Sequence, residues 1–250
     1  MNEIQFYENI PYDPERHERN TLDIYLPKDQ EQAPLLIYFY GGGLESGCRQ
    51  DVRALGEYLS ARGVAVAAPD YRIYPEARFP EYIQDAARAS AFLIRRPEWK
   101  NRRIFIGGHS AGAYLSAMLW ADKRYLAQEG LDADGIGGYL LLSPQPTTHF
   151  NVLRERGEDV RKVVVDEAAP LYFVRETGAP LFLAVAERDM ENREQQNRLL
   201  VSTLKHFGYK GEVYFRYLKG HDHGSYIVPA FEGDVPELFP EILEYIRGRS

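Results

Sequence analysis

Residues 102–120, RRIFIGGHSAGAYLSAMLW, constrain the fold of this chain more than any other stretch. A short run of apolar, β-favouring residues at 104–106 stops at two glycines. From Ala111 the chain continues in good helix formers, with apolar residues on all sides of the helix. The pattern predicts a buried strand, a sharp turn and a buried helix, with Ser110 at the apex of the turn.

Two glycines flank this serine at the spacing Gly-x-Ser-x-Gly. A strained strand-to-helix turn needs Gly108 and Gly112, because a side chain at either position would collide with the neighbouring strand or helix. The turn lifts the Ser110 hydroxyl clear of the backbone and sets it at the amino end of a helix. Unpaired N–H groups and the helix dipole favour developing negative charge there. The Gly-x-Ser-x-Gly spacing can also arise by chance. The predicted strand before it and helix after it are the structural context that favours a nucleophilic serine.

Composition narrows the kind of partner. Of the 250 residues, 44% are hydrophobic and 13% aromatic, which is enough to fill a core. The net charge of −7, without a strip of Lys, Arg and aromatic residues, argues against nucleic acid or an anionic membrane and favours a small-molecule partner.

The first residues resemble no signal peptide and no run is long enough to span a membrane, so we expect a cytoplasmic protein. The single cysteine, Cys48, is expected to be a small packing residue.

Strand-like and helix-like segments alternate along the chain. Apolar runs predict strands at 21–26, 35–40, 64–72, 104–106, 135–144, 180–189 and 212–218. Helical spacing of apolar residues predicts helices at 51–62, 83–94, 111–120, 196–208 and 235–246. This alternation predicts an α/β protein with a mostly parallel sheet, helices on both faces and one domain over residues 1–250.

Two segments depart from the alternation. Residues 21–26, TLDIYL, alternate apolar and polar side chains, and we predict a half-exposed edge strand within hairpin structure at the start of the chain. Residues 146–178 lack a clear partner strand. We expect them to form a small cap excursion over the sheet.

Polar residues and glycines follow the predicted strands. Because functional groups in an open parallel sheet lie beyond the carboxyl ends of the strands, these residues are the candidates for a site. They are Tyr40–Gly43, Asp70, Ser110, Ser143, Glu187, Asp189, His221 and His223. A serine needs a base within hydrogen-bond reach, and the base needs an acid to hold its tautomer. All three residue types are present.

The spacing leaves two choices open. Asp189 and Glu187 compete as the acid. His221 and His223 lie two residues apart and would point the same way in an extended segment, so alternation does not choose the base.

The glycine run suggests a third element of the site. Gly42 and Gly43 would present backbone N–H groups to an oxyanion, together with the N–H of Ala111. The absence of Gly-Lys-Ser/Thr after the run argues against a phosphate loop. No cofactor and no metal site are predicted.

Four motifs together resemble the α/β-hydrolase superfamily. They are Gly-His-Ser-Ala-Gly at 108–112, Tyr-Gly-Gly-Gly at 40–43, Asp-Tyr-Arg-x-x-Pro-Glu at 70–76, and the chain order Ser, Asp, His. Within it the chain is similar to carboxylesterases of the hormone-sensitive-lipase-like group, small acetyl and feruloyl esterases and kynurenine formamidases. The resemblance implies an α/β-hydrolase fold of about eight strands, with one antiparallel strand near the start.

The same resemblance implies roles for residues. Ser110 would be the nucleophile, Asp189 the acid and His223 the base, since His223 is followed by Gly224 and Ser225 in the family's pattern. Gly42, Gly43 and Ala111 would supply the oxyanion hole.

Two residues depart from the family pattern. Tyr40 stands where the family usually has a histidine, which alters what anchors the glycine loop. Leu44 stands where a larger aromatic residue is common, so the acyl pocket is expected to differ in shape.

The expected activity is hydrolysis of a small or medium carboxylic ester through an acyl-enzyme on Ser110. Two alternatives remain: an amide hydrolase that uses the same residues, and a hydrolase-like protein that binds a ligand without turnover. The acyl group, the alcohol and the oligomeric state are not predicted.

Overall fold

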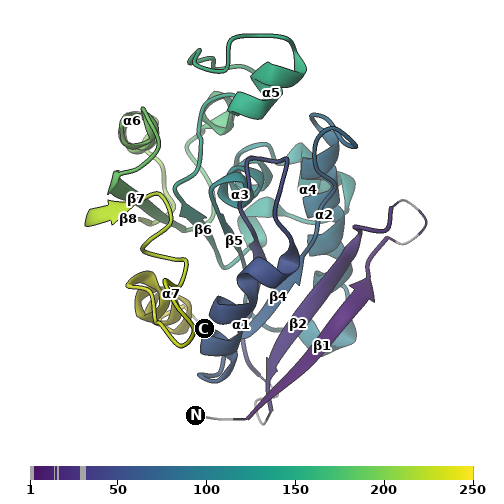
Figure 1. The fold of residues 1–250 in the computed structure, drawn as a ribbon. Helices are drawn as coiled ribbons and strands as arrows, with labels where there is room; N and C mark the ends of the chain where they lie inside the picture. The colour runs from purple at the N-terminus through teal and green to yellow at the C-terminus, as the bar shows by residue number, and fades with distance from the viewer. Residues whose placement is uncertain (1–2, 14, 16, 29–31, 250) are drawn as a thin grey trace.

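The described residues of the computed structural model, 3–13, 15, 17–28 and 32–249, are organised on an eight-stranded sheet in the order β1-β2-β4-β3-β5-β6-β7-β8 (Figure 1). The strands are β1 (Ile4–Pro11), β2 (Thr21–Pro27), β3 (Leu35–Phe39), β4 (Ala65–Pro69), β5 (Ile104–His109), β6 (Gly138–Leu142), β7 (Leu181–Arg188) and β8 (Val213–Asp222). From β4 to β8 every neighbouring pair is parallel, whereas β2 is antiparallel to both β1 and β4. The mostly parallel sheet and its one antiparallel strand near the start are therefore confirmed.

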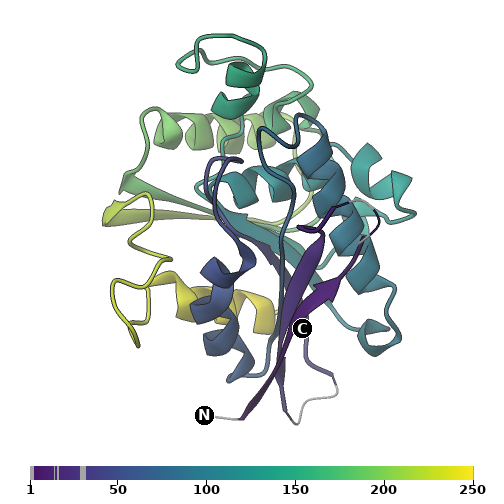
Figure 2. The ribbon, with the colours of Figure 1, turned by 45° about the vertical axis from the view of Figure 1, so that its right-hand side comes forward.

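Helices cover both faces of the sheet, as predicted. They are α1 (Arg53–Ser60), α2 (Glu81–Ile94), α3 (Ala111–Ala121), α4 (Arg124–Gln128), α5 (Phe150–Glu155), α6 (Arg193–His206) and α7 (Leu238–Arg247). Short 3₁₀ helices lie at η1 (Arg49–Val52), η2 (Pro97–Trp99), η3 (Ala133–Gly135) and η4 (Pro170–Phe173). Figure 2 shows α6 and α7 on opposite faces, with α1 beside α7. In the described part of the chain, no helix is both long and apolar enough to cross a bilayer.

The centre of the sheet and α3 form the core. All residues of β3, β4 and β6 are buried, and so is every residue of α3. A helix that is apolar all round can be stable only when it is covered all round, and α3 packs on β5 and β6 and against α2. This confirms the predicted buried strand–turn–buried helix unit and places the turn in the middle of the molecule.

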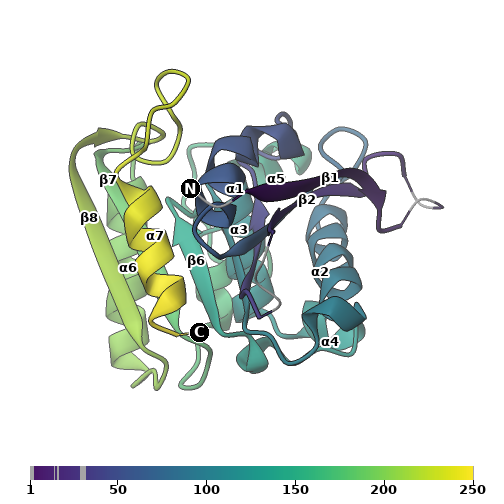
Figure 3. The ribbon, with the colours of Figure 1, turned by 90° about the horizontal axis from the view of Figure 1, so that it is seen from below.

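The prediction of a half-exposed edge strand at 21–26 was wrong. β2 is mostly buried and lies inside the sheet, and the largely exposed β1 forms the edge, opposite β8 at the other end (Figure 3). The polar position that suggested exposure, Asp23, is buried because its carboxylate accepts hydrogen bonds from Arg49 Nε at 2.8 Å and from the Asn9 backbone N–H at 2.9 Å. A paired buried carboxylate gives the same alternating pattern as a solvent-facing one.

Residues 146–178 contain α5 and η4 joined by irregular chain, and none of them forms a strand. Figure 1 shows α5 above the carboxyl ends of the central strands. The segment is fastened to the core where the buried Tyr114 hydroxyl of α3 donates to the Ala168 carbonyl at 2.8 Å. Its outer part is open to solvent, with Val163 58% exposed.

Candidate active site

The turn at Ser110 joins β5 to α3 in a strained backbone conformation. Ser110 has φ 56° and ψ −116°, a region that a non-glycine residue rarely adopts. A Cβ at Gly108 would lie 2.5 Å from the Phe39 carbonyl oxygen, and one at Gly112 would lie 2.0 Å from the same atom. The predicted reason for both glycines is thereby confirmed: only a bare backbone lets α3 approach β3 this closely.

Three side chains from distant parts of the sequence meet above this turn. Ser110 Oγ lies 2.8 Å from His223 Nε2, and His223 Nδ1 lies 2.5 Å from Asp189 Oδ1. Because a carboxylate accepts hydrogen bonds, Nδ1 carries the proton and Nε2 is free to accept from the serine hydroxyl. The arrangement can therefore take a proton from Ser110 and hold the resulting imidazolium beside a negative charge.

Asp189 is held by more than the histidine. Its side chain is 1% exposed; Oδ1 also accepts from the Met190 N–H at 2.7 Å, and Oδ2 accepts from the Ala186 N–H at 3.2 Å and from the Ser143 hydroxyl. Burial by itself raises the pKa of Asp189, but the hydrogen bonds from His223 and Ser143 outweigh it and hold the pKa below its usual value. The carboxylate is therefore ionised and fixed in orientation.

The competing acid and base lie elsewhere. His221 Nε2 lies 2.8 Å from Glu237 Oε2, and its Nδ1 lies 3.2 Å from the Ser225 hydroxyl. Glu187 is exposed and accepts from the Gly220 N–H at 2.8 Å. Neither side chain is hydrogen-bonded to Ser110, His223 or Asp189 in the described structure.

The loop after β3 lies against the serine. We call residues 40–47 the oxyanion loop, after the role that the sequence predicts for its glycines; a Cβ at Gly41 would lie 3.3 Å from Ser110 Cβ, so the loop packs against the serine. Among the described residues, none accepts a hydrogen bond from the backbone N–H of Gly42, Gly43 or Ala111. These donors remain available to a ligand oxygen.

Sequence reasoning missed four residues around the site. Ser143 was noted at the end of a strand but not assigned a role; its Oγ lies 2.5 Å from the buried Tyr226 hydroxyl, which extends the hydrogen-bond chain behind Asp189. Arg193, 4% exposed, donates to the Ser143 carbonyl at 2.7 Å. Ser143, directly after β6, Tyr226, three residues after His223, and His109, inside the motif at 108–112, carried a positional signal, whereas Arg193 carried none.

His109 is the fourth of these residues. Its Nε2 lies 2.6 Å from the His223 carbonyl oxygen, and because a carbonyl only accepts, Nε2–H is the donor. Burial, together with the neighbouring His223, lowers the pKa of His109 to about 3. His109 is therefore neutral at physiological pH and supports the backbone of His223 without competing for protons.

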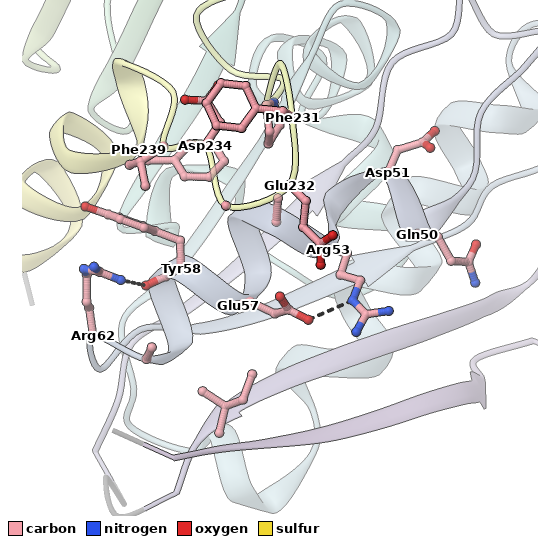
Figure 4. A pocket seen from close by; sticks show the side chains of 16 residues that line it. Gln50, Asp51, Arg53, Glu57, Tyr58, Arg62, Phe231, Glu232, Asp234 and Phe239 are labelled. Carbon is pink, nitrogen blue, oxygen red and sulfur yellow. Dashed lines mark hydrogen bonds and ion pairs between the residues drawn. The ribbon is translucent and has the colours of Figure 1, made fainter. Parts of the chain in front are cut away.

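Neither of two cavities among the described residues is lined by Ser110, His223 or Asp189. One of about 350 Å³ is lined by Phe150 and Val163 of the excursion and by Met190, which follows Asp189. The Phe150 ring also lies against the oxyanion loop, since a Cβ at Gly43 would meet its Cζ at 3.1 Å. A larger cavity, about 980 Å³, lies between α1 and residues 229–235 and is lined by none of the three meeting side chains (Figure 4). Within the described residues no cluster of three His, Cys, Asp or Glu side chains is arranged to hold a metal ion.

The strand order, the covering helices and the turn at Ser110 form an α/β-hydrolase fold. The family BD-FAE matches residues 22–132. The chain is 31% identical to isoprenylcysteine alpha-carbonyl methylesterase ICME of Arabidopsis thaliana over 93% of its own length and 60% of that protein. It is 26% identical to kynurenine formamidase of Danio rerio, covering 88% of this chain and 75% of that one.

Solved structures share the fold. A truncated carbohydrate esterase from gut microbiota superposes with a TM-score of 0.77 at 20% identity, over 98% of this chain and 96% of the other. The chain spans from 24% to 60% of the length of the plant methylesterases that it matches. The chain is thus similar in sequence to esterases and to a formamidase, and similar in fold to solved esterases.

Proposed function

We propose that the chain is a serine hydrolase that cleaves small or medium carboxylic esters through an acyl-enzyme on Ser110. The observation that carries the proposal is the hydrogen-bonded row Ser110–His223–Asp189 at 2.8 and 2.5 Å. An isolated serine hydroxyl is a poor nucleophile at neutral pH. A base whose tautomer is fixed by a carboxylate makes it reactive, because the base removes the hydroxyl proton during the attack.

In the proposed reaction, Ser110 Oγ attacks the ester carbonyl while His223 accepts its proton. The N–H groups of Gly42, Gly43 and Ala111, which lack partners among the described residues, would bind the oxyanion of the tetrahedral intermediate. His223 then returns the proton to the leaving alcohol, and water repeats the sequence on the acyl-enzyme. Asp189 stays ionised throughout and stabilises the imidazolium.

A cavity lined by Met190, the residue after Asp189, is consistent in size with a small or medium substrate, although Ser110 and His223 do not line it. The 350 Å³ cavity lies at the lower end of the range for small-molecule pockets. Phe150 contacts Gly43 and also lines this cavity, which supports a role for the excursion, residues 146–178, as a cap that shapes substrate choice.

The test is Ser110→Ala against a series of p-nitrophenyl esters of rising chain length. We expect wild type to hydrolyse the short and medium esters and the variant to lose turnover by several orders of magnitude with its fold intact, judged by circular dichroism. Covalent labelling of wild type, but not of Ser110→Ala, by a fluorophosphonate is the second readout. A chain that binds these esters without turnover or labelling would be the non-catalytic alternative.

An amide hydrolase is the second candidate, because the kynurenine formamidase relative is matched over three quarters of its length. Ester and amide versions of one acyl group, assayed side by side, distinguish the two. Faster cleavage of the amide would overturn the ester assignment while leaving the three residues in place.

A further inference from the structure

Arg19, in the connection between β1 and β2, joins three segments that lie far apart in the sequence. Its Nη2 donates to the Tyr40 hydroxyl at 2.8 Å and to the Gly47 carbonyl at 2.8 Å, and its Nε donates to the Tyr71 carbonyl at 3.2 Å. Tyr40 and Gly47 are the first and last residues of the oxyanion loop. One guanidinium group therefore holds both ends of that loop.

Tyr71 completes the closure at the base of the loop. Its ring stacks on Tyr40 with centroids 4.6 Å apart and an interplanar angle of 17°. Its hydroxyl donates to the Tyr40 carbonyl at 3.0 Å and lies 3.4 Å from the Gly41 carbonyl. The stack fixes the Tyr40 ring, so the hydroxyl that Arg19 binds is itself held in place.

Between these ends the Gly42 carbonyl accepts from the Glu45 and Ser46 N–H groups at 3.1 and 3.0 Å, so Arg19 holds the two sides of an internally bonded turn. Gly42 has φ 105°, Gly43 has φ 66° and Leu44 has φ 65°, so three consecutive residues occupy the left-handed half of the map. Because glycine can adopt many other backbone conformations, the contacts that hold the loop decide where the Gly42 and Gly43 N–H groups point. A misplacement on the order of 1 Å in a catalytic group can cost about 10²-fold in rate.

We infer that Arg19 is a positioning residue for the oxyanion hole, acting through Tyr40 and the Gly47 carbonyl; this rests on the proposed function. Arg19 binds the Tyr40 hydroxyl and so anchors the first residue of the loop to the connection between β1 and β2. The residue lies outside every motif that the sequence offers.

The experiment compares Arg19→Met, Arg19→Lys and Arg53→Met. Methionine keeps an unbranched apolar stem, lysine can reach some but not all of the three acceptors, and Arg53 is a matched control whose side chain pairs with Glu57 on α1. We expect Arg19→Met to lower kcat for a p-nitrophenyl ester by about 10- to 100-fold with KM within about twofold. Arg19→Lys should recover part of the loss, and Arg53→Met should match wild type.

A second readout is independent of the ester chosen. The rate of fluorophosphonate labelling of Ser110 needs the oxyanion hole but no particular acyl group, and it should fall with kcat in Arg19→Met. Tyr40→Phe removes the hydroxyl that Arg19 binds, so its combination with Arg19→Met should lose less than the product of the two single losses.

Rates are normalised to the folded fraction, measured by circular dichroism. The inference would be overturned if Arg19→Met stayed within twofold of wild type in both kcat and the labelling rate. It would also be overturned if only KM changed, or if the effects of Arg19→Met and Tyr40→Phe multiplied independently. A wild-type chain that neither labels nor hydrolyses would instead overturn the proposed function, and the positioning role with it.

Discussion

Replacing Asp189 by asparagine tests the core of the site. Both carboxylate oxygens accept from fixed backbone donors, the Met190 N–H on Oδ1 and the Ala186 N–H on Oδ2. An asparagine must therefore turn its NH₂ group toward one of them. If the NH₂ group takes the place of Oδ1, it faces His223 Nδ1–H, and the imidazole is driven into the wrong tautomer. If it takes the place of Oδ2, the tautomer survives but the negative charge is lost.

The two orientations set the expected range. Two unit charges about 4 Å apart interact by about 4 kcal/mol at an effective dielectric constant near 20, which is about 10³-fold in rate. The His223 side chain is 26% exposed, so solvent reduces this value. A wrong tautomer costs about 10⁴-fold. We therefore expect kcat to fall by about 10²- to 10⁴-fold.

The assay is steady-state hydrolysis of a p-nitrophenyl ester, with Glu187→Gln as the matched control. Glu187 lies two residues away but is exposed and bonds only the Gly220 N–H among the contacts described. Its variant should stay within a fewfold of wild type. A loss of less than tenfold in Asp189→Asn, or an exchange of the two phenotypes, would show that Asp189 is not the acid.

The same variant has a signature in stability. The pKa of Asp189 is lowered on folding, so its contribution is present above the ordinary value near 3.9 and is lost as pH falls through the folded value. Asp189→Asn should therefore show a shallower loss of stability below pH 4 than wild type does.

The remaining predictions concern histidines. His223→Ala should lose nearly all turnover, together with the pH dependence of the rate. His221→Ala removes only a partner of Glu237 and should keep both the turnover and its pH dependence. The reverse result would make His221 the base. His149 is 1% exposed, and burial, with Arg193 and Arg154, lowers its pKa well below 6.5. Because the unfolded chain binds a proton on this histidine that the folded chain does not, the free energy of unfolding, measured with urea, should fall as the pH drops below about 6.5. His149→Asn should abolish this part, and an unchanged pH slope would contradict it.

Local sequence patterns predicted the structure correctly where all the residues that determine it lie in one segment. The turn at Ser110 needs two glycines and a helix that is apolar all round, and all of these lie within residues 102–120. The alternation of buried strands and helices similarly predicted the parallel sheet and covered faces. It failed at β2, because Asp23 is buried through hydrogen bonds from Arg49 and Asn9, and both residues come from other segments.

Only the tertiary structure could decide matters that depend on residues far apart in the chain. Period-2 spacing gives His221 and His223 the same direction, and it is the bend after β8 that brings His223 to Ser110 and leaves His221 beside Glu237. Arg19 likewise has no local pattern, since its three acceptors are separated from it by 21 to 52 residues. A sequence pattern records the local preferences of a segment, whereas the contacts that orient a site form only when the sheet brings its strand ends together.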